Sequence, residues 1–106
     1  MAASLGTFEQ AVLLSVYRLR DEAYGRPIIK DVGIRLRRKV SAGAAYATLA
    51  RLEARGLISS RLAEGTTGRG GRARRFYRLE RDGVLALNEA RTLVTALWQG
   101  VRRSLA

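Results

Sequence analysis

The stretch from residue 41 to residue 79 constrains the fold of this chain more than any other part of the sequence. It opens with Ser41, a favourable helix N-cap, continues as an alanine-rich amphipathic segment, and reaches Gly56, where a glycine can end a helix in left-handed conformation. After this glycine come a strand-like segment, a loop with four glycines, and a returning strand, at residues 57–63, 64–72 and 76–79. The order helix, glycine stop and hairpin is therefore predicted from local signals alone.

The hairpin region is also strongly basic. Between Arg51 and Arg81 there are nine arginines and three glutamates. A helix followed by a hairpin with a cationic, glycine-rich tip is the geometry of a winged helix-turn-helix protein on duplex DNA, with the helix in the major groove and the hairpin on an adjacent groove or the backbone. The alternative is a solvated hairpin whose cations only protect its edge from aggregation.

Two further helices are expected before residue 41. Phe8, Val12, Val16 and Leu19 recur at helical spacing, and we expect Thr7 to be the N-cap with Gln10 three residues on. A turn over residues 21–25 ends in a glycine that can supply a positive φ. A second helix then starts near Pro27 and carries Gly33 inside it, which predicts a weak or short helix. Its buried side is Ile28, Ile29, Val32 and Leu36, and its C-terminal end is loaded with cations at Arg35, Arg37, Arg38 and Lys39.

The third helix presents small residues on its outer face. If Ala45, Leu49 and Leu52 face the core, the exposed side is largely glycine and alanine, which lets a backbone sit deep in a groove and lets methyl groups meet thymine methyls. An alanine-rich helix of high propensity with a half-buried tyrosine is the alternative. The residues predicted to contact DNA are Ser41, Gly43, Ala44, Tyr46, Ala47, Thr48 and Arg51 on the helix and Arg69, Arg72, Arg74 and Arg75 on the hairpin, although Arg74 can also be a simple exposed strand position.

The C-terminal segment carries a heptad-like apolar stripe. We expect a helix after Asp82 and Gly83, with more apolar surface than one small domain can cover. A second copy of the chain is the expected partner, across an interface made by Leu87, Val94, Leu97, Trp98, Val101 and Leu105. Trp98 serves there either as an apolar anchor or as an aromatic wall for a flat ligand between subunits.

Composition excludes several classes of function. The net charge of +11 on 106 residues favours a polyanionic partner, and the absence of cysteine and histidine excludes disulfides, zinc fingers and histidine-based catalysis. The carboxylates are scattered and no nucleophile has a base, so we expect no enzyme, no metal and no cofactor. Without a signal peptide or a run of ~18 apolar residues, the predicted location is the cytoplasm, in association with the nucleoid and not with a membrane.

Taken in order, four segments resemble the PadR family of bacterial transcriptional regulators: LGTFE at 5–9, EAYGRPI at 22–28, SAGAAYATLARLEARGL at 41–57 and GGRARRFYRL at 70–79. The resemblance implies a winged-helix domain, a homodimer made by the C-terminal helix with help from the first helix, and repression through palindromic operators. It also implies DNA contacts by Tyr46, its exposed neighbours and the wing arginines. Some relatives release DNA on binding phenolic acids or flat cationic drugs, and this chain resembles the short branch with one C-terminal helix.

The predicted fold is mainly α-helical with a small β-hairpin. It comprises a winged helix-turn-helix domain over residues 5–81 and a C-terminal dimerisation helix over residues 82–106. The predicted function is a homodimeric, sequence-specific DNA-binding regulator, a repressor, with a flat aromatic effector as a candidate ligand at Trp98. Two alternatives stay open: an arginine-rich RNA- or ribosome-binding protein without operator specificity, and an adaptor or ligand-binding module that has lost DNA binding.

Overall fold

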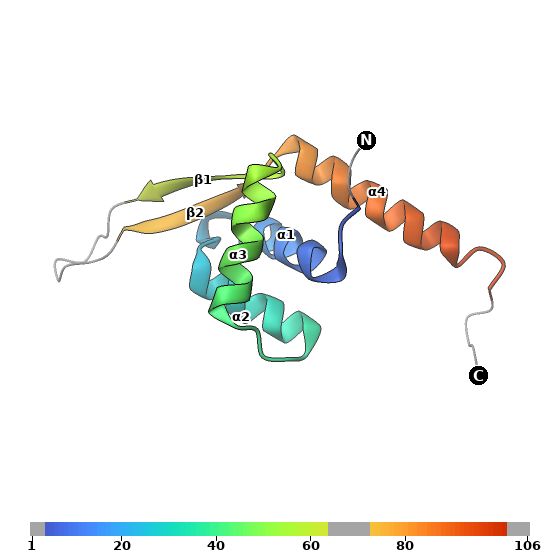
Figure 1. Cartoon of the computed structure of the whole chain (residues 1–106), viewed down its shortest axis with the longest axis horizontal. Coiled ribbons are helices and arrows are strands. Elements are labelled where there is room, and N and C mark those ends of the chain that lie inside the picture. Colours follow the sequence, from blue (N-terminus) through green and yellow to red (C-terminus); the bar gives the residue numbers. More distant parts are fainter. Residues whose placement is uncertain (1–3, 64–72, 102–106) are drawn as a thin grey trace.

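The computed structural model describes residues 4–63 and 73–101 (Figure 1). This part of the chain forms four α-helices, one short 3₁₀ helix and one antiparallel hairpin. In chain order these are α1 (Thr7–Leu19), η1 (Arg20–Glu22), α2 (Gly25–Leu36), α3 (Ala42–Ala54), β1 (Ile58–Ala63), β2 (Arg74–Leu79) and α4 (Arg81–Leu97). The predicted fold class, mainly helical with a small hairpin, is confirmed.

Helix α1 begins one residue earlier than expected. Gly6 is the N-cap in extended conformation, and its backbone N–H donates to Glu9 Oε1 at 2.9 Å. The prediction of Thr7 as N-cap paired with Gln10 is therefore wrong. The charged carboxylate of Glu9 reaches the free N–H at the helix start, while the Gln10 amide donates to the carbonyl oxygen of Leu5 at 3.0 Å.

Helix α2 runs for 12 residues and ends in a Schellman turn. The backbone N–H of Arg38 donates to the Gly33 carbonyl oxygen at 3.1 Å, and that of Arg37 donates to the Ile34 carbonyl oxygen at 3.3 Å. Arg37 takes the left-handed position that glycine normally fills, with φ 56° and ψ 43°. A Cβ on Gly33 would lie 3.1 Å from the Arg38 carbonyl oxygen, so this glycine makes room for the returning chain.

Both predicted ends of α3 are confirmed. Ser41 Oγ accepts a hydrogen bond from the Ala44 backbone N–H at 3.1 Å, and Gly56 closes the helix with φ 78°. The Leu57 N–H donates to the Leu52 carbonyl oxygen at 3.0 Å, which completes a Schellman turn leading directly into β1.

The hairpin pairs β1 and β2 in a regular antiparallel register. Ile58 lies opposite Leu79 and Ser60 opposite Tyr77, while Arg61 lies opposite Phe76. The segment before α2 adds a third piece to this sheet, because the Tyr77 N–H donates to the Ala23 carbonyl oxygen at 2.8 Å next to a Tyr24–Phe76 bridge. The wing is thereby anchored to the helical body. The loop predicted over residues 64–72 lies outside the described part of the chain.

The core lies where α1, α2, α3 and the hairpin meet. It is formed by fully or nearly buried apolar side chains, among them Val12, Leu13, Val16, Ile28, Val32, Leu49, Leu52, Ile58 and Tyr77. At its edge Asp31 accepts hydrogen bonds from Ser15 and Arg18. Partial burial raises the pKa of Asp31, but the hydrogen bonds from Ser15 and Arg18 and the charges of Arg18 and Arg35 outweigh it, so the pKa lies below its usual range.

Helix α4 begins earlier and ends earlier than expected. Glu80 is its N-cap, so Asp82 and Gly83 lie inside the first turn and do not precede the helix. The helix ends at Leu97 with Trp98 as C-cap, followed by Gly100 at φ 75°. A residue at such a φ cannot continue an α-helix, so Val101 lies beyond α4 and the predicted helical stripe is shorter than expected; Leu105 lies outside the described residues. Most of α4 projects from the body (Figure 1).

Candidate DNA-binding face and dimer surface

The outward face of α3 is made of small side chains. Gly43, Ala44, Ala47, Ala50 and Arg51 are all exposed, as expected from the inward placement of Ala45, Leu49 and Leu52. Ser41 is exposed at the N-terminal end of this face. Apart from Arg51 this face has no long side chain, which allows close approach of another molecule to the helix backbone.

Thr48 is the exception among the predicted contact residues. Its exposed fraction is 2%, because it shares the inner side of the helix with Ala45, Leu49 and Leu52. The prediction that Thr48 faces DNA is therefore wrong. Its Oγ1 instead accepts a hydrogen bond from Arg51 Nη2 at 3.0 Å. This bond orients the side chain of Arg51, which is one of the predicted DNA contacts.

Tyr46 is half exposed and lies against the start of α2. A Cβ on Gly25 would overlap the Tyr46 hydroxyl group and lie 2.7 Å from Cζ of its ring. Gly25 is thus needed for space, and its φ is not positive, contrary to the turn role expected for it. The contact holds the Tyr46 ring at the junction of α2 and α3.

The hairpin arginines divide between its two faces. Arg75 Nη1 donates to Ser60 Oγ at 2.9 Å, and Ser60 Oγ donates to Glu53 Oε2 of α3 at 2.7 Å. Arg75 is therefore held on the α3 side. Arg74 points the other way and stacks on the Tyr24 ring, with its Cζ 4.5 Å from the ring centroid. Arg69 and Arg72 lie outside the described residues.

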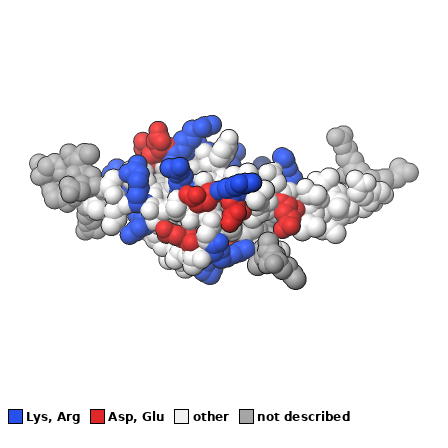
Figure 2. Space-filling model, turned by 90° about the horizontal axis from the view of Figure 1, so that it is seen from above, with Lys and Arg blue, Asp and Glu red and all other residues white. Residues whose placement is uncertain are grey.

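The link from Glu53 through Ser60 to Arg75 was not predicted. These residues belong to a helix and two strands, and the sequence offers no periodic signal that would bring them together. The cations at the C-terminal end of α2 also suit the negative end of the helix dipole. The structure leaves Arg35, Arg37, Arg38 and Lys39 exposed next to the N-terminal end of α3. Figure 2 shows blue side chains grouped near the base of the hairpin, whereas the outer part of α4 is largely white.

A separate apolar surface lies along α4 and one side of α1. Large side chains that are at least 40% exposed include Leu14, Val84, Leu85, Leu93, Val94, Leu97, Trp98 and Val101. A hollow of about 370 Å³ between the two helices is lined by Gln10, Leu14, Leu87, Asn88, Arg91, Val94 and Thr95. Leu87, predicted to lie at the dimer interface, is half-buried and packs against the core of its own chain.

Trp98 lies near the C-terminal end of this surface, before Val101. Its exposed fraction is 50%, and it is the C-cap of α4, three residues past the end of the hollow at Thr95. Within residues 4–63 and 73–101 no helix is long and apolar enough to cross a membrane. The same residues contain no cluster of acidic side chains that could hold a metal ion.

The fold is a winged helix-turn-helix with a C-terminal helix. It is formed by α1, α2 and α3, by the hairpin that is bridged to the segment before α2, and by α4. Comparison with known proteins agrees. The chain belongs to the PadR-like family of transcriptional regulators, whose family model matches residues 13–89. The predicted family and the prediction that the chain is not an enzyme are thus confirmed. No match to a curated protein was found.

Solved structures place the chain in the same family. A PadR-like transcription factor from Bacteroides fragilis is 30% identical with a TM-score of 0.74, over 91% of this chain and 87% of that one. A PadR family regulator from Eggerthella lenta is 29% identical with a TM-score of 0.66, over 85% and 76%. The Aeropyrum pernix Orc1 protein, solved in complex with DNA, shares the fold at 24% identity and a TM-score of 0.67, over 88% of this chain and 26% of that one.

Proposed function

We propose that this protein is a homodimeric repressor that binds a specific operator, with α3 in the major groove and the hairpin on the adjacent groove or backbone. The observation that carries the proposal is the outward face of α3. It is free of long side chains along Gly43, Ala47 and Ala50, and it has Tyr46 on one flank and Arg75 on the hairpin side. This shape fits a groove and places donors where phosphates would run on either side.

Two of these donors are held before any DNA arrives. Tyr46 is fixed by its contact with Gly25, and Arg75 by its hydrogen bond to Ser60. A side chain that is already ordered loses less rotamer freedom on binding, which costs about 0.5–1.5 kcal/mol for each flexible side chain immobilised. Ser41, Ala44 and Arg51 lie along the same exposed surface. The proposed contacts also include Arg74 and, beyond the described residues, Arg69 and Arg72.

The apolar surface of α4 supports the homodimer. Val94, Leu97 and Trp98 are all about half exposed or more. Leu14 of α1 and Val94 both line the hollow between α1 and α4. A two-fold contact through this surface would place two copies of α3 on one duplex, which is why the operator would be palindromic. Such a protein acts in the cytoplasm, on the nucleoid.

The proposal extends to an effector. A planar aromatic molecule that stacks on Trp98 at the subunit interface would release the operator if it preferred one relative placement of the two copies of α3. A typical coupling free energy of about 1–3 kcal/mol corresponds to a 5–150-fold change in operator affinity.

The test begins with genomic fragments that the purified protein retains, followed by footprinting. If about six phosphates are neutralised per dimer, operator affinity should fall ~10³-fold between 50 and 200 mM salt. Arg75→Ala should weaken binding to every duplex and lower the salt slope by about one. Arg81→Ala, which removes the same charge at the start of α4, is the control and should change the slope little.

Transcription from the footprinted promoter then decides the sign of regulation, because a repressor must lower it. Equal affinity for operator, random duplex and structured RNA at physiological salt would contradict the proposed function. That result would favour an arginine-rich RNA-binding protein.

A further inference from the structure

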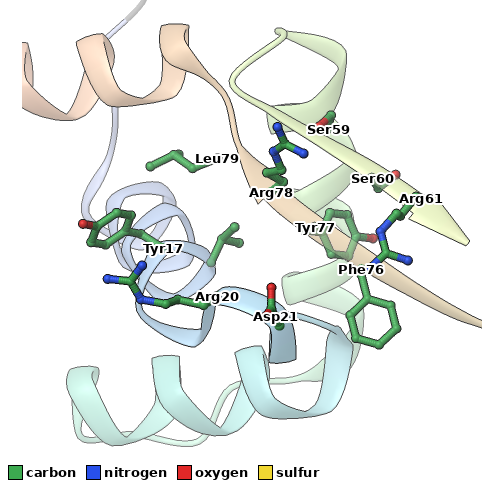
Figure 3. A pocket seen from close by; sticks show the side chains of 11 residues that line it. Tyr17, Arg20, Asp21, Ser59, Ser60, Arg61, Phe76, Tyr77, Arg78 and Leu79 are labelled. Carbon is green, nitrogen blue, oxygen red and sulfur yellow. The ribbon is translucent and has the colours of Figure 1, made fainter. Parts of the chain in front are cut away.

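A second hollow, of about 480 Å³, lies between the C-terminal end of α1 and the hairpin (Figure 3). Its volume falls within the range of small-molecule sites. Its walls come from α1, η1 and both strands of the hairpin, which bring together residues 16–21, 59–61 and 76–79. The lining residues that matter here are Tyr17, Arg20, Asp21, Arg61, Phe76 and Arg78.

This hollow opens away from the proposed DNA-binding face. Ser60 points toward α3, because it donates to Glu53. Side chains alternate along a strand, so Arg61 and its register partner Phe76 point to the opposite side of the hairpin. In Figure 3 α3 passes behind the hairpin, while Arg61 lies in front of it and Arg20 lies beside α1. A ligand in the hollow would leave the outward face of α3 free, while Arg74, on the same side of the hairpin as Phe76, is the one described residue among the proposed DNA contacts that lies near it.

The lining is cationic. It holds three guanidinium groups and one carboxylate, Asp21. The ion pairs formed within residues 4–63 and 73–101 join Arg18 and Arg35 to Asp31 and Arg55 to Glu9, and none involves Arg20, Arg61 or Arg78.

Two of these arginines lie against aromatic rings. Arg20 Cζ is 5.5 Å from the centroid of the Tyr17 ring, and Arg61 Cζ is 5.2 Å from that of Phe76. A guanidinium that lies over a ring keeps its N–H edges available for a bidentate anion.

The backbone at Arg20 is a second, independent observation. Its φ is 51° and its ψ is −116°, a combination that side chains other than glycine rarely adopt. Such conformations persist where the surrounding structure holds them, and they gather at ligand-binding sites. Here the conformation stands at the junction of α1 and η1, on the rim of the hollow.

We propose that this hollow is a binding site for a phosphate monoester that carries a planar ring, a molecule of the size and chemistry of a mononucleotide. Three guanidinium groups and one carboxylate leave two positive charges, which match the charge of about −1.5 to −2 on a phosphate monoester at pH 7. Arg20 and Arg61 line opposite walls of the hollow, each beside an aromatic ring, and the exposed Tyr17 ring gives the planar part a stacking surface.

The test is calorimetric titration of the full chain, without DNA, at 150 mM salt. The probes are adenosine 5′-monophosphate, adenosine and inorganic phosphate. We expect one site per chain for the mononucleotide, with at least tenfold weaker binding of each half molecule. Equal affinity of the mononucleotide and inorganic phosphate would overturn the proposal, because a protein of charge +11 attracts any phosphate without a built site.

Variants locate the site. Arg20→Ala and Arg61→Ala should each weaken binding of adenosine 5′-monophosphate at least tenfold, whereas Arg26→Ala removes the same charge from the exposed start of α2 and should leave binding unchanged. Asp21→Asn removes the one acidic lining residue and should tighten binding about threefold. Asp21→Asn without effect, or Arg26→Ala as damaging as Arg61→Ala, would refute the assignment. Because no DNA is present, these results do not depend on the proposed operator binding.

Discussion

Gly83 offers the sharpest test of how α4 is attached to the winged domain. It lies in the first turn of α4, and an added Cβ would overlap the carbonyl oxygen of Leu57 and lie 2.7 Å from Leu79 Cδ1. The same carbonyl oxygen accepts the Glu80 backbone N–H at 3.0 Å. Gly83→Ala therefore meets backbone that cannot rotate out of the way, and the start of α4 must move off the hairpin.

The expected magnitude combines three contributions. Overpacking costs about 1–3 kcal/mol, and loss of the hydrogen bond to Leu57 costs about 0.5–1.5 kcal/mol. Alanine in place of glycine within a helix returns up to about 1 kcal/mol. Gly83→Ala should therefore lower the free energy of unfolding by about 1–3 kcal/mol. At about 4–8 °C per kcal/mol for a domain of this size, Tm should fall by roughly 10 °C.

The matched control is Gly43→Ala. Gly43 also lies in the first turn of a helix, but no atom lies within 4 Å of its added Cβ. This variant should be as stable as the unmodified protein or up to about 1 kcal/mol more stable. Thermal unfolding is followed by circular dichroism at one protein concentration, since a dimer's Tm depends on concentration. A Gly83→Ala protein at least as stable as Gly43→Ala would refute the packing of α4 on Leu57.

Three further predictions concern other parts of the molecule. The pKa of Asp31 is lowered in the folded state, so its contribution to stability is present above the unfolded pKa of about 3.9 and is lost as pH falls through the folded pKa. Asp31→Asn should therefore lower the free energy of unfolding, measured in urea, at pH 7. An equal decrease in the free energy of unfolding at pH 3 would contradict this. Arg37→Gly should raise the free energy of unfolding by about 1 kcal/mol, because Arg37 occupies a left-handed position; a lower Tm would show that its side chain stabilises the turn instead. Val94→Asp should yield monomers by light scattering at micromolar concentration, while the same change at the exposed Ile34 of α2, away from this surface, should not. A monomeric mass for the unmodified protein would rule out the proposed interface.

The ends of α3 and its inward stripe are properties of the sequence itself. Ser41 caps the helix through its own side chain, and Gly56 closes it with a backbone angle that other residues avoid. Each effect acts within a few residues, so local chemistry determines it. The spacing of Ala45, Leu49 and Leu52 likewise reflects the helical repeat. The same holds for the glycine-rich loop between the two strand segments and for the excess of arginine.

Only the tertiary structure determined which of these elements pack against one another and which side chains come into contact. Gly25 and Gly83 are glycine because Tyr46 and Leu57, distant in sequence, approach them closely. Neighbouring positions on one element have different environments. Thr48 is buried and accepts a hydrogen bond from the exposed Arg51, and Arg74 and Arg75 lie on opposite faces of the hairpin.

The arginine-lined hollow beside Tyr17 has no signal in the sequence, since its walls come from α1, η1 and both strands. Local propensities depend on residues a few positions apart, whereas these features depend on which surfaces meet when the core closes. That packing is settled by the whole chain at once.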